Sequence, residues 1–252
     1  MEEPIKKIEV IYKDRDLLVI NKPAEVAVHP PLSGRKNDFY LTDWLIKNFP
    51  EVTGVGDEPN LRPGLVHRLD KDTSGVMVIA RNQNSFEALK NIFKNRLIEK
   101  IYWAIVCGLP KKKVGIISLP IGRLVSNPLK RGVATDKSRI RGEREAVTKY
   151  KVLKGEEKYS LLELKPETGR MHQLRVHLKA IGHPVACDKV YGGSNVCCPP
   201  RLARRESGEA GPSDATHQLL HAKSLSFSFP AGRKLYFEAD PPEDFARAMK
   251  LC

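Results

Sequence analysis

Three clusters of polar side chains interrupt otherwise apolar segments of this sequence, and each contains residue types that can do chemistry. The first cluster, residues 64–75 (GLVHRLDKDTSG), stands directly before the apolar run of residues 76–80. It holds an imidazole, an arginine, a lysine and two carboxylates, which are groups that serve in acid–base and nucleophilic catalysis. So many ionisable residues against a buried strand are hard to explain as core. The alternative is an ordinary charged turn, because loops carry charge without having a function.

The second cluster is short and largely aromatic, whereas the third has five ionisable residues on a helical pattern. Residues 100–103 (KIYW) place a tyrosine and a tryptophan in a strand-like run, where an aromatic packed on an edge strand is the simpler explanation. Residues 167–177 (ETGRMHQLRVH) open a helical pattern in which His172 and Arg175 stand three positions apart and share a face. His177 lies five positions from His172, about 140° around a helix, so the two histidines make a poor metal site.

The sequence lacks the motifs of other common enzyme classes. The sequence contains no G-x-S-x-G, no Walker A motif and no G-x-G-x-x-G. We therefore expect no nucleotide cofactor and no metal.

The elements that must position these clusters follow from hydrophobic periodicity. Alternating or continuous apolar runs predict strands at residues 8–12, 17–20, 76–80, 101–107, 159–165 and 225–229. Apolar residues at helical spacing predict helices at residues 41–49, 84–96 and 170–181, the last ended by Gly182 and Pro184, and a short terminal helix after Pro242. This order of elements favours one α+β domain over residues 1–252, with a mostly antiparallel central sheet and flanking helices.

The charge indicates the partner. The chain has 252 residues and a formal net charge of +13, and 41% of its residues are hydrophobic, which excludes an intrinsically disordered chain. Residues 123–154 hold ten basic and three acidic residues, a net charge of +7 and thus over half of the total. We expect this segment to form an exposed basic loop or hairpin that binds a polyanion, although a merely basic protein is the alternative.

Other features bear on the compartment and on mobile segments. No apolar run approaches the length of a membrane helix and the start is not typical of a signal peptide, so a cytoplasmic protein is expected. The five cysteines form no C-x-x-C pair, and we interpret the adjacent Cys197 and Cys198 as reduced thiols rather than part of a disulfide framework. Residues 194–216 are rich in Gly, Pro, Ser and Arg, which predicts a mobile insertion, with an additional contact to the polyanion as the alternative.

The order and context of the clusters resemble the RluA family of RNA pseudouridine synthases. The resemblance rests on LLVINKP, HRLDKDTSG, KIYWAIV, ETGRMHQLRVHLKAIGHPVACDKVYGG and the late strand HQLLHAKSLSFSFP, and it covers nearly the whole chain. It implies a pseudouridine synthase fold with a central RNA-binding cleft. It also implies isomerisation of specific uridines to pseudouridine in structured RNA, which needs no cofactor.

The resemblance further implies roles for single residues. Asp70 matches the essential carboxylate of the family, Arg175 the basic residue paired with it, and Tyr102 the tyrosine that packs on the target base and is a candidate for proton transfer at C5. Because the uridine must leave its stack, Arg68 matches the arginine that fills the vacated space. Three further cleft residues are expected to touch phosphate or base, with packing or surface ion pairs as the alternative: Lys22, Arg170 and His172.

Several expectations concern the RNA and the assembly. The resemblance begins within ten residues of Met1, so the small N-terminal S4 domain of many relatives is not expected, and residues 123–154 are the candidate RNA grip. The partner is expected to be rRNA or tRNA, and the protein a monomer. The alternatives are a non-catalytic RNA-binding or RNA-folding protein on the same scaffold and, on charge alone, a ribosome-associated structural protein.

Overall fold

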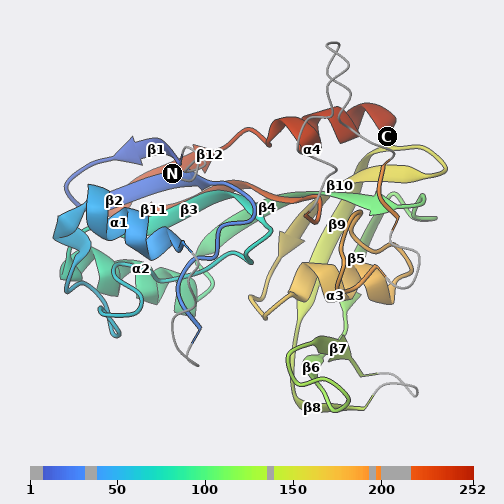
Figure 1. Cartoon of the computed structure of the whole chain (residues 1–252), viewed down its shortest axis with the longest axis horizontal. Coiled ribbons are helices and arrows are strands. Elements are labelled where there is room, and N and C mark those ends of the chain that lie inside the picture. Colours follow the sequence, from blue (N-terminus) through green and yellow to red (C-terminus); the bar gives the residue numbers. More distant parts are fainter. Residues whose placement is uncertain (1–7, 32–38, 135–138, 193–196, 200–216) are drawn as a thin grey trace. The chain divides into compact units, whose positions relative to one another are not determined.

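A computed structural model describes residues 8–31, 39–134, 139–192, 197–199 and 217–252 (Figure 1). The chain forms two compact units: unit 1 comprises Met1–Lys100 and Ala222–Asp240, and unit 2 comprises Ile101–His221 and Pro241–Cys252. That the whole chain acts as one domain stays a prediction. The predicted insertion at residues 194–216 lies outside the described residues except for positions 197–199.

In unit 1 the strand order is β1-β2-β3-β11, and β12 pairs with β11. Its strands are β1 (Glu9–Lys13), β2 (Leu17–Lys22), β3 (Ser74–Ala80), most of β11 (Leu220–Phe229) and β12 (Arg233–Glu238). The β1–β2, β2–β3 and β11–β12 pairs are antiparallel. All residues of β3 are buried, as expected from the continuous apolar run of residues 76–80.

The helices of unit 1 are α1 (Leu41–Asn48) and α2 (Gln83–Lys94), with the 3-10 turns η1 (Pro50–Val52) and η2 (Pro230–Gly232). The helical stripe predicted at residues 84–96 is confirmed, because Phe86, Leu89 and Ile92 of α2 pack into one core with the strands. That core includes Val76 and Val78 of β3.

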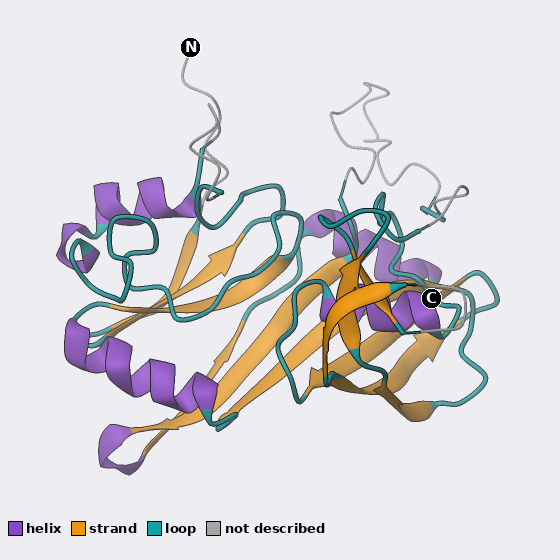
Figure 2. Ribbon diagram, turned by 90° about the horizontal axis from the view of Figure 1, so that it is seen from below, coloured by secondary structure: helices purple, strands orange, loops and turns teal. Residues whose placement is uncertain are grey.

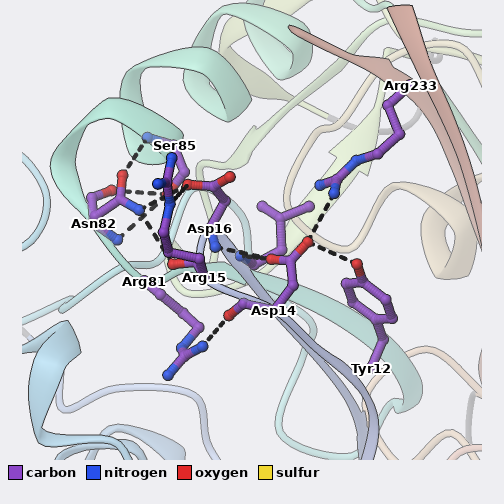
Figure 3. Close-up of polar contacts among 9 residues, drawn as sticks. Tyr12, Asp14, Arg15, Asp16, Arg81, Asn82, Ser85 and Arg233 are labelled. Atoms are coloured by element: carbon purple, nitrogen blue, oxygen red, sulfur yellow. Dashed lines mark hydrogen bonds and ion pairs between the residues drawn. The ribbon is translucent and has the colours of Figure 1, made fainter. Parts of the chain in front are cut away.

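A polar network fixes the turn between β1 and β2 (Figure 3). The Asp14 carboxylate accepts the backbone N–H groups of Asp16 (2.8 Å) and Leu17 (2.7 Å), the Tyr12 hydroxyl (2.6 Å) and the Arg233 guanidinium (2.9 Å). Partial burial alone would raise the pKa of Asp14, but these hydrogen bonds lower it to about 2. The carboxylate therefore stays charged and holds the turn over the ordinary pH range.

The same network reaches the start of α2. The Asn82 side chain caps the helix by accepting the Ser85 N–H (2.9 Å), and its amide group donates to the Asp16 carboxylate (3.0 Å). Arg81 donates to the backbone carbonyl of Asp14 (Figure 3). The turn and the helix that follows β3 are thus tied together.

Unit 2 contains a second run of paired strands in the order β4, β10, β9, β5, all antiparallel. They are β4 (Ile98–Cys107), which begins in unit 1, β10 (Tyr159–Pro166), β9 (Val147–Gly155) and β5 (Val114–Ser118). A separate sheet has the order β7-β6-β8, from β6 (Ile121–Leu124), β7 (Arg131–Val133) and β8 (Ile140–Arg144). The basic segment thus forms a small sheet that leads into β9, which refines the prediction of a loop or hairpin.

Helices α3 (Gln173–Ala180) and α4 (Glu243–Ala248) belong to unit 2, the latter followed by the 3-10 turn η3 (Met249–Leu251). The two helices pack against side chains that alternate along β4. Ala104 and Val106 pack with Leu174 and Leu178 of α3, whereas Ile105 packs with Phe245 and Ala248 of α4. In Figure 1 the β6–β7–β8 sheet lies next to α3, where Ile121 and Val133 pack against Val176.

The prediction of reduced, unpaired cysteines is wrong. Cys107 is bonded to Cys197 and Cys187 to Cys198, and Cys252 is the one free cysteine of the five. The neighbours Cys197 and Cys198 cannot conveniently bond each other, but tertiary folding brings a separate partner to each. Cys107 lies 90 positions from Cys197, so the spacing of the cysteines along the chain carried no signal of this pairing.

The α+β class is confirmed, with a mixed, mostly antiparallel strand arrangement and few helices (Figure 2). The helix predicted at residues 170–181 is shorter, because His172 takes a left-handed conformation (φ +57°) and α3 begins only at Gln173. Its end matches the prediction: Gly182 has φ +85°, and its N–H donates to the Lys179 carbonyl (3.0 Å).

Candidate active site

The loop of residues 64–75 that carries Asp70 is closed by a glycine at each end. Gly64 has φ +67°, and a Cβ there would lie 2.4 Å from the Ala80 carbonyl oxygen. Gly75 has φ +117°, and its Cβ would lie 2.2 Å from the Ala222 carbonyl oxygen. Both the backbone conformation and the close approach of a strand therefore require glycine. The two residues fix where the loop leaves and rejoins the sheet of unit 1.

His67 anchors the loop to β3. Its Nε2 accepts the Val78 N–H (3.1 Å), and its ring stacks on Phe93 of α2 (centroids 4.6 Å apart). Burial, together with the positive charge of Lys100, lowers the pKa of His67 to about 3. The imidazole is therefore neutral and serves as a hydrogen-bond acceptor. His67, the histidine of the first cluster, thus has a structural role.

Lys22 supports the same loop from β2. Its side chain is fully buried, and Nζ donates to the carbonyls of Pro23 (2.7 Å), Val26 (2.8 Å) and Lys71 (3.0 Å). Three acceptors match the three N–H donors of an ammonium group. Since Lys71 directly follows Asp70, the hydrogen bond from Lys22 to the Lys71 carbonyl fixes the backbone next to Asp70. A side chain with no exposed surface is poorly suited to the phosphate contact that the sequence predicts.

Asp70 and Arg68 stand on this fixed loop. Asp70 is partly buried, and its carbonyl accepts the Thr73 N–H (3.1 Å) in a tight turn. Arg68 is exposed, with Nη1 3.3 Å from Nε2 of His29. Leu69 between them is buried, so it anchors the loop while Arg68 and Asp70 keep exposed surface. The role that the resemblance implies for Arg68, filling the space of the flipped uridine, stays a prediction.

Tyr102 lies on β4 in unit 2, opposite Leu164 of β10. The ring is half-buried and packs against the apolar cluster that also contains Leu174 and Leu178 of α3. Tyr102 and the helix that carries Arg175 therefore share one face of the same strands. Two of the three predicted catalytic residues are thus brought to one side of unit 2.

Arg175 is buried and forms a two-pronged ion pair with a residue that sequence reasoning did not single out. Its Nε and Nη2 donate to the two carboxylate oxygens of Asp188, at 2.7 and 2.9 Å. Burial alone would raise the pKa of Asp188, but the hydrogen bonds and charge of Arg175, with two backbone N–H groups, lower it. The available signal was an acid within an apolar run, after Val185 and Ala186.

The pairing of Arg175 with Asp70 stays a prediction, since Asp70 belongs to unit 1 and Arg175 to unit 2. The Nε–Nη2 edge of the guanidinium is directed at Asp188.

The two remaining predicted residues lie just before α3. Arg170 Nε donates to the Glu145 carbonyl (3.0 Å), and its backbone N–H donates to the Gln173 side chain (3.0 Å). His172 Nδ1 is hydrogen-bonded to the Tyr191 hydroxyl (2.8 Å). Both residues are partly exposed, so each combines a structural contact with a surface that RNA could reach.

His177 is a structural histidine. It is fully buried, with Nδ1 2.9 Å from the Thr148 hydroxyl and Nε2 2.9 Å from the Leu119 carbonyl. Burial lowers its pKa. Among the described residues there is no group of three or more side chains suited to hold a metal ion, and no described helix is long and apolar enough to cross a membrane.

The basic segment presents a row of arginines on the β7-β6-β8 sheet. Arg123 of β6 lies directly opposite Arg131 of β7 and Arg141 of β8. Like charges in cross-strand pairs repel, and within the described part of the chain no acidic side chain forms an ion pair with any of the three. Of the three, Arg131 is held by its own turn, since its Nη1 donates to the carbonyls of Pro128 (3.0 Å) and Lys130 (3.2 Å).

Comparison with known proteins shows which family contains the Asp70 loop, β4 and α3. The family described as RNA pseudouridylate synthase matches residues 16–180, well over half of the chain. The chain belongs to the RNA pseudouridylate synthase family. The match spans the loop of Asp70, strand β4 with Tyr102, and α3 with Arg175.

Individual members of the family agree along nearly the whole chain. An RNA pseudouridine synthase of Aquifex aeolicus (strain VF5) is 40% identical over 244 residues, which are 94% of this chain and 71% of that protein. Ribosomal large subunit pseudouridine synthase D of Zymomonas mobilis is 35% identical over 245 residues, 97% of this chain and 72% of that protein. The activity is therefore that of an RNA pseudouridine synthase, an isomerase with an RNA substrate.

The solved structures support the fold as well. Human RNA pseudouridylate synthase domain containing 1 matches with a TM-score of 0.71 and 26% identity, covering 99% of this chain and 89% of that one. Human RNA pseudouridylate synthase domain containing 4 matches with a TM-score of 0.70 and 29% identity, covering 96% of this chain and 92% of that one. The pseudouridine synthase fold inferred from the sequence is confirmed.

Proposed function

We propose that this pseudouridine synthase modifies uridines of structured rRNA or tRNA with Asp70 as its essential carboxylate, assisted by Tyr102 and Arg175. The observation that carries the proposal is the family match over residues 16–180, which includes all three residues in their expected contexts. The relatives named for the large ribosomal subunit support rRNA as a substrate. The proposed location is the cytoplasm, where rRNA and tRNA are found in bacteria such as these relatives.

The isomerisation breaks the N1–C1′ glycosidic bond, forms a C5–C1′ bond, and exchanges a proton at C5 for one at N1. No electrons are gained or lost, and no water is consumed. Asp70 attacks the sugar or the base as an ionised carboxylate, for which the cation of Arg175 is a suitable partner. Tyr102 packs on the base and its hydroxyl moves the C5 proton.

The fixed loop supports this assignment. A nucleophile works when it is held close to its reaction geometry, since misplacement by about 1 Å costs about 100-fold in rate. Gly64, His67, Lys22 and Gly75 all anchor the short segment around Asp70. The exposed Arg68 is suited to fill the space of the flipped uridine, which offsets part of the cost of unstacking.

The arginine row is the candidate RNA grip. The row of Arg123, Arg131 and Arg141 offers three cations on neighbouring strands. Strands lie about 4.8 Å apart, so the row can contact successive phosphates of a folded RNA. Its affinity would come from the release of counterions and would be sensitive to salt.

The test is a map of pseudouridine in rRNA and tRNA treated with the purified protein. Asp70→Asn should abolish the modification, whereas Asp72→Asn, which removes a carboxylate from the same loop, should retain it. Equal modification by wild type and Asp70→Asn would contradict the role of Asp70. A wild-type protein that binds RNA and modifies none would favour the non-catalytic alternative.

A further inference from the structure

The segment after α3 holds the Arg175 guanidinium from two directions. Asp188 takes its Nε–Nη2 edge at 2.7 and 2.9 Å. The ring of Tyr191 lies against its flat face, with Cζ of Arg175 5.0 Å from the ring centroid. A two-pronged hydrogen bond fixes the plane of a guanidinium, and an aromatic face limits its tilt. The long arginine side chain is thereby restricted to one orientation.

Asp188 is itself firmly held. Its Oδ1 accepts the backbone N–H groups of Val190 (2.9 Å) and Tyr191 (3.0 Å), and the side chain is almost wholly buried. A buried ion pair is weak grounds for stability, because the desolvation cost offsets the attraction. A pair with both partners so fully oriented is better explained by the geometry that it imposes on Arg175.

Tyr191 connects this clamp to the arginine row. Its hydroxyl accepts the backbone N–H of Arg131 on β7 (3.0 Å) and is bonded to Nδ1 of His172 (2.8 Å), directly before α3. Its ring is buried. One side chain thus contacts the edge strand β7, which carries Arg131 of the arginine row, the start of α3, and the guanidinium on that helix.

We propose that Asp188 and Tyr191 are positioning residues that orient the Arg175 guanidinium for its action at the target uridine. The inference rests on the proposed function, in which Arg175 is the partner of Asp70. Neither residue needs to touch RNA. Asp188 sets the direction of the guanidinium plane. Tyr191 stacks on that plane, and its hydroxyl is hydrogen-bonded to the backbone of β7.

The first experiment replaces Asp188→Asn and measures the single-turnover rate on a modified rRNA or tRNA at saturating protein, together with the RNA Kd. Asparagine keeps the shape but turns an amide N–H toward the N–H donors of Arg175. The rate should fall by about 10- to 100-fold, with the Kd unchanged. The matched control is Asp244→Asn, which removes another poorly exposed carboxylate of unit 2, paired with His217 at 2.8 Å; its rate should stay at the wild-type value.

A double-mutant cycle separates positioning from general destabilisation. If Asp188 acts through Arg175, adding Asp188→Asn to Arg175→Met should cause no further loss of rate. It should also raise the thermal midpoint above that of Arg175→Met alone, because the single variant leaves a buried carboxylate without its cation. Multiplicative losses of rate in the double variant would overturn the proposal.

Tyr191→Phe provides a variant that keeps the ion pair and the ring. It removes the hydroxyl that contacts Arg131 and His172, and it should lower the rate by a few-fold with the Kd unchanged. A wild-type rate in both Asp188→Asn and Tyr191→Phe would overturn the inference while leaving the proposed function intact. Wild-type protein that forms no pseudouridine would overturn both.

Discussion

Lys22 shows how the surroundings of a residue decide what its charge does. A lysine near the start of a motif is expected at an RNA phosphate, yet this one donates to three backbone carbonyls in the interior of unit 1. Its position beneath the Asp70 loop makes it a support for the site. A buried ammonium is tolerated because every donor has an acceptor.

Lys22→Met should therefore reduce stability more than RNA affinity. The three carbonyls lose their donor, so the free energy of unfolding should fall by roughly 2 to 4 kcal/mol in urea denaturation. Lys71→Met, which changes an exposed side chain of the same loop, should leave stability unchanged. A Lys22→Met protein of full stability but weaker RNA binding would instead support the phosphate contact.

His67 should make stability depend on pH. Its folded pKa of about 3 lies below the ordinary value near 6.5, so the unfolded chain takes up the proton first. The stabilising contribution is fully present above pH 6.5 and is lost as the pH falls toward 3, with a slope of at most about 1.4 kcal/mol per pH unit. Thermal midpoints from pH 7.5 to 4.5 should fall less steeply for His67→Gln than for wild type; parallel curves would contradict a neutral His67.

At the scale of elements, the close approach of β11 to β3 determines how the Asp70 loop ends. Gly75 lies opposite Lys22 in the β2–β3 register and faces the backbone of Ala222 on its other side. The sequence shows a glycine at this position, but only the pairing of strands far apart in the chain explains why no Cβ fits.

Gly75→Ala should be much more damaging than alanine at another glycine of positive φ. Gly142 has φ +61° with no atom within 4 Å of a Cβ, so Gly142→Ala should cost only about 1 to 2 kcal/mol for the backbone strain. Gly75→Ala adds a clash with the Ala222 backbone and should cost clearly more, or prevent folding. Equal losses in urea denaturation would show that β11 can move away.

The arginine row makes the β7-β6-β8 sheet testable as an RNA grip. Arg123→Gln with Arg141→Gln should reduce the slope of log K against log salt by about two, one for each arginine that no longer neutralises a phosphate. The exposed Lys111 and Lys112, changed to glutamine, serve as the charge-matched control and should leave a steeper slope. An unchanged slope in the arginine variant would remove this sheet from the RNA interface.

At the scale of the whole molecule, two disulfides tie residues 197 and 198 to Cys107 and Cys187. Cross-links that close loops reduce the entropy of the unfolded chain. Because Cys187 directly precedes Asp188, the second cross-link also holds the segment that carries the Arg175 clamp. Stability and the proposed positioning device thus share one region of unit 2.

Non-reduced, denatured protein should accordingly show one reactive thiol, that of Cys252, and five after reduction. Reduction should lower the thermal midpoint by roughly 15 °C or more, since the two cross-links together contribute about 7 kcal/mol and each kcal/mol shifts the midpoint of a chain of this size by about 2 to 4 °C. Cys252→Ser should leave the midpoint unchanged. Five reactive thiols without reductant would show that the cross-links do not form.

Much of this protein could be predicted from its sequence because the informative patterns are local. Hydrophobic periodicity located α2 and β3 and the end of α3 at Gly182, and the motif residues Asp70, Tyr102 and Arg175 identified the family. Charge alone located the basic segment. These signals depend on neighbours within a few positions, which the linear sequence contains.

The tertiary structure decided what depends on residues far apart in the chain. It buried Lys22 beneath the Asp70 loop and placed Asp188 and Tyr191 around Arg175. It also bonded Cys107 to a cysteine 90 positions away and aligned Arg123, Arg131 and Arg141 across three strands. Burial, hydrogen-bond partners and disulfide partners are properties of the packed chain, so the same residue types had several possible roles until packing selected one.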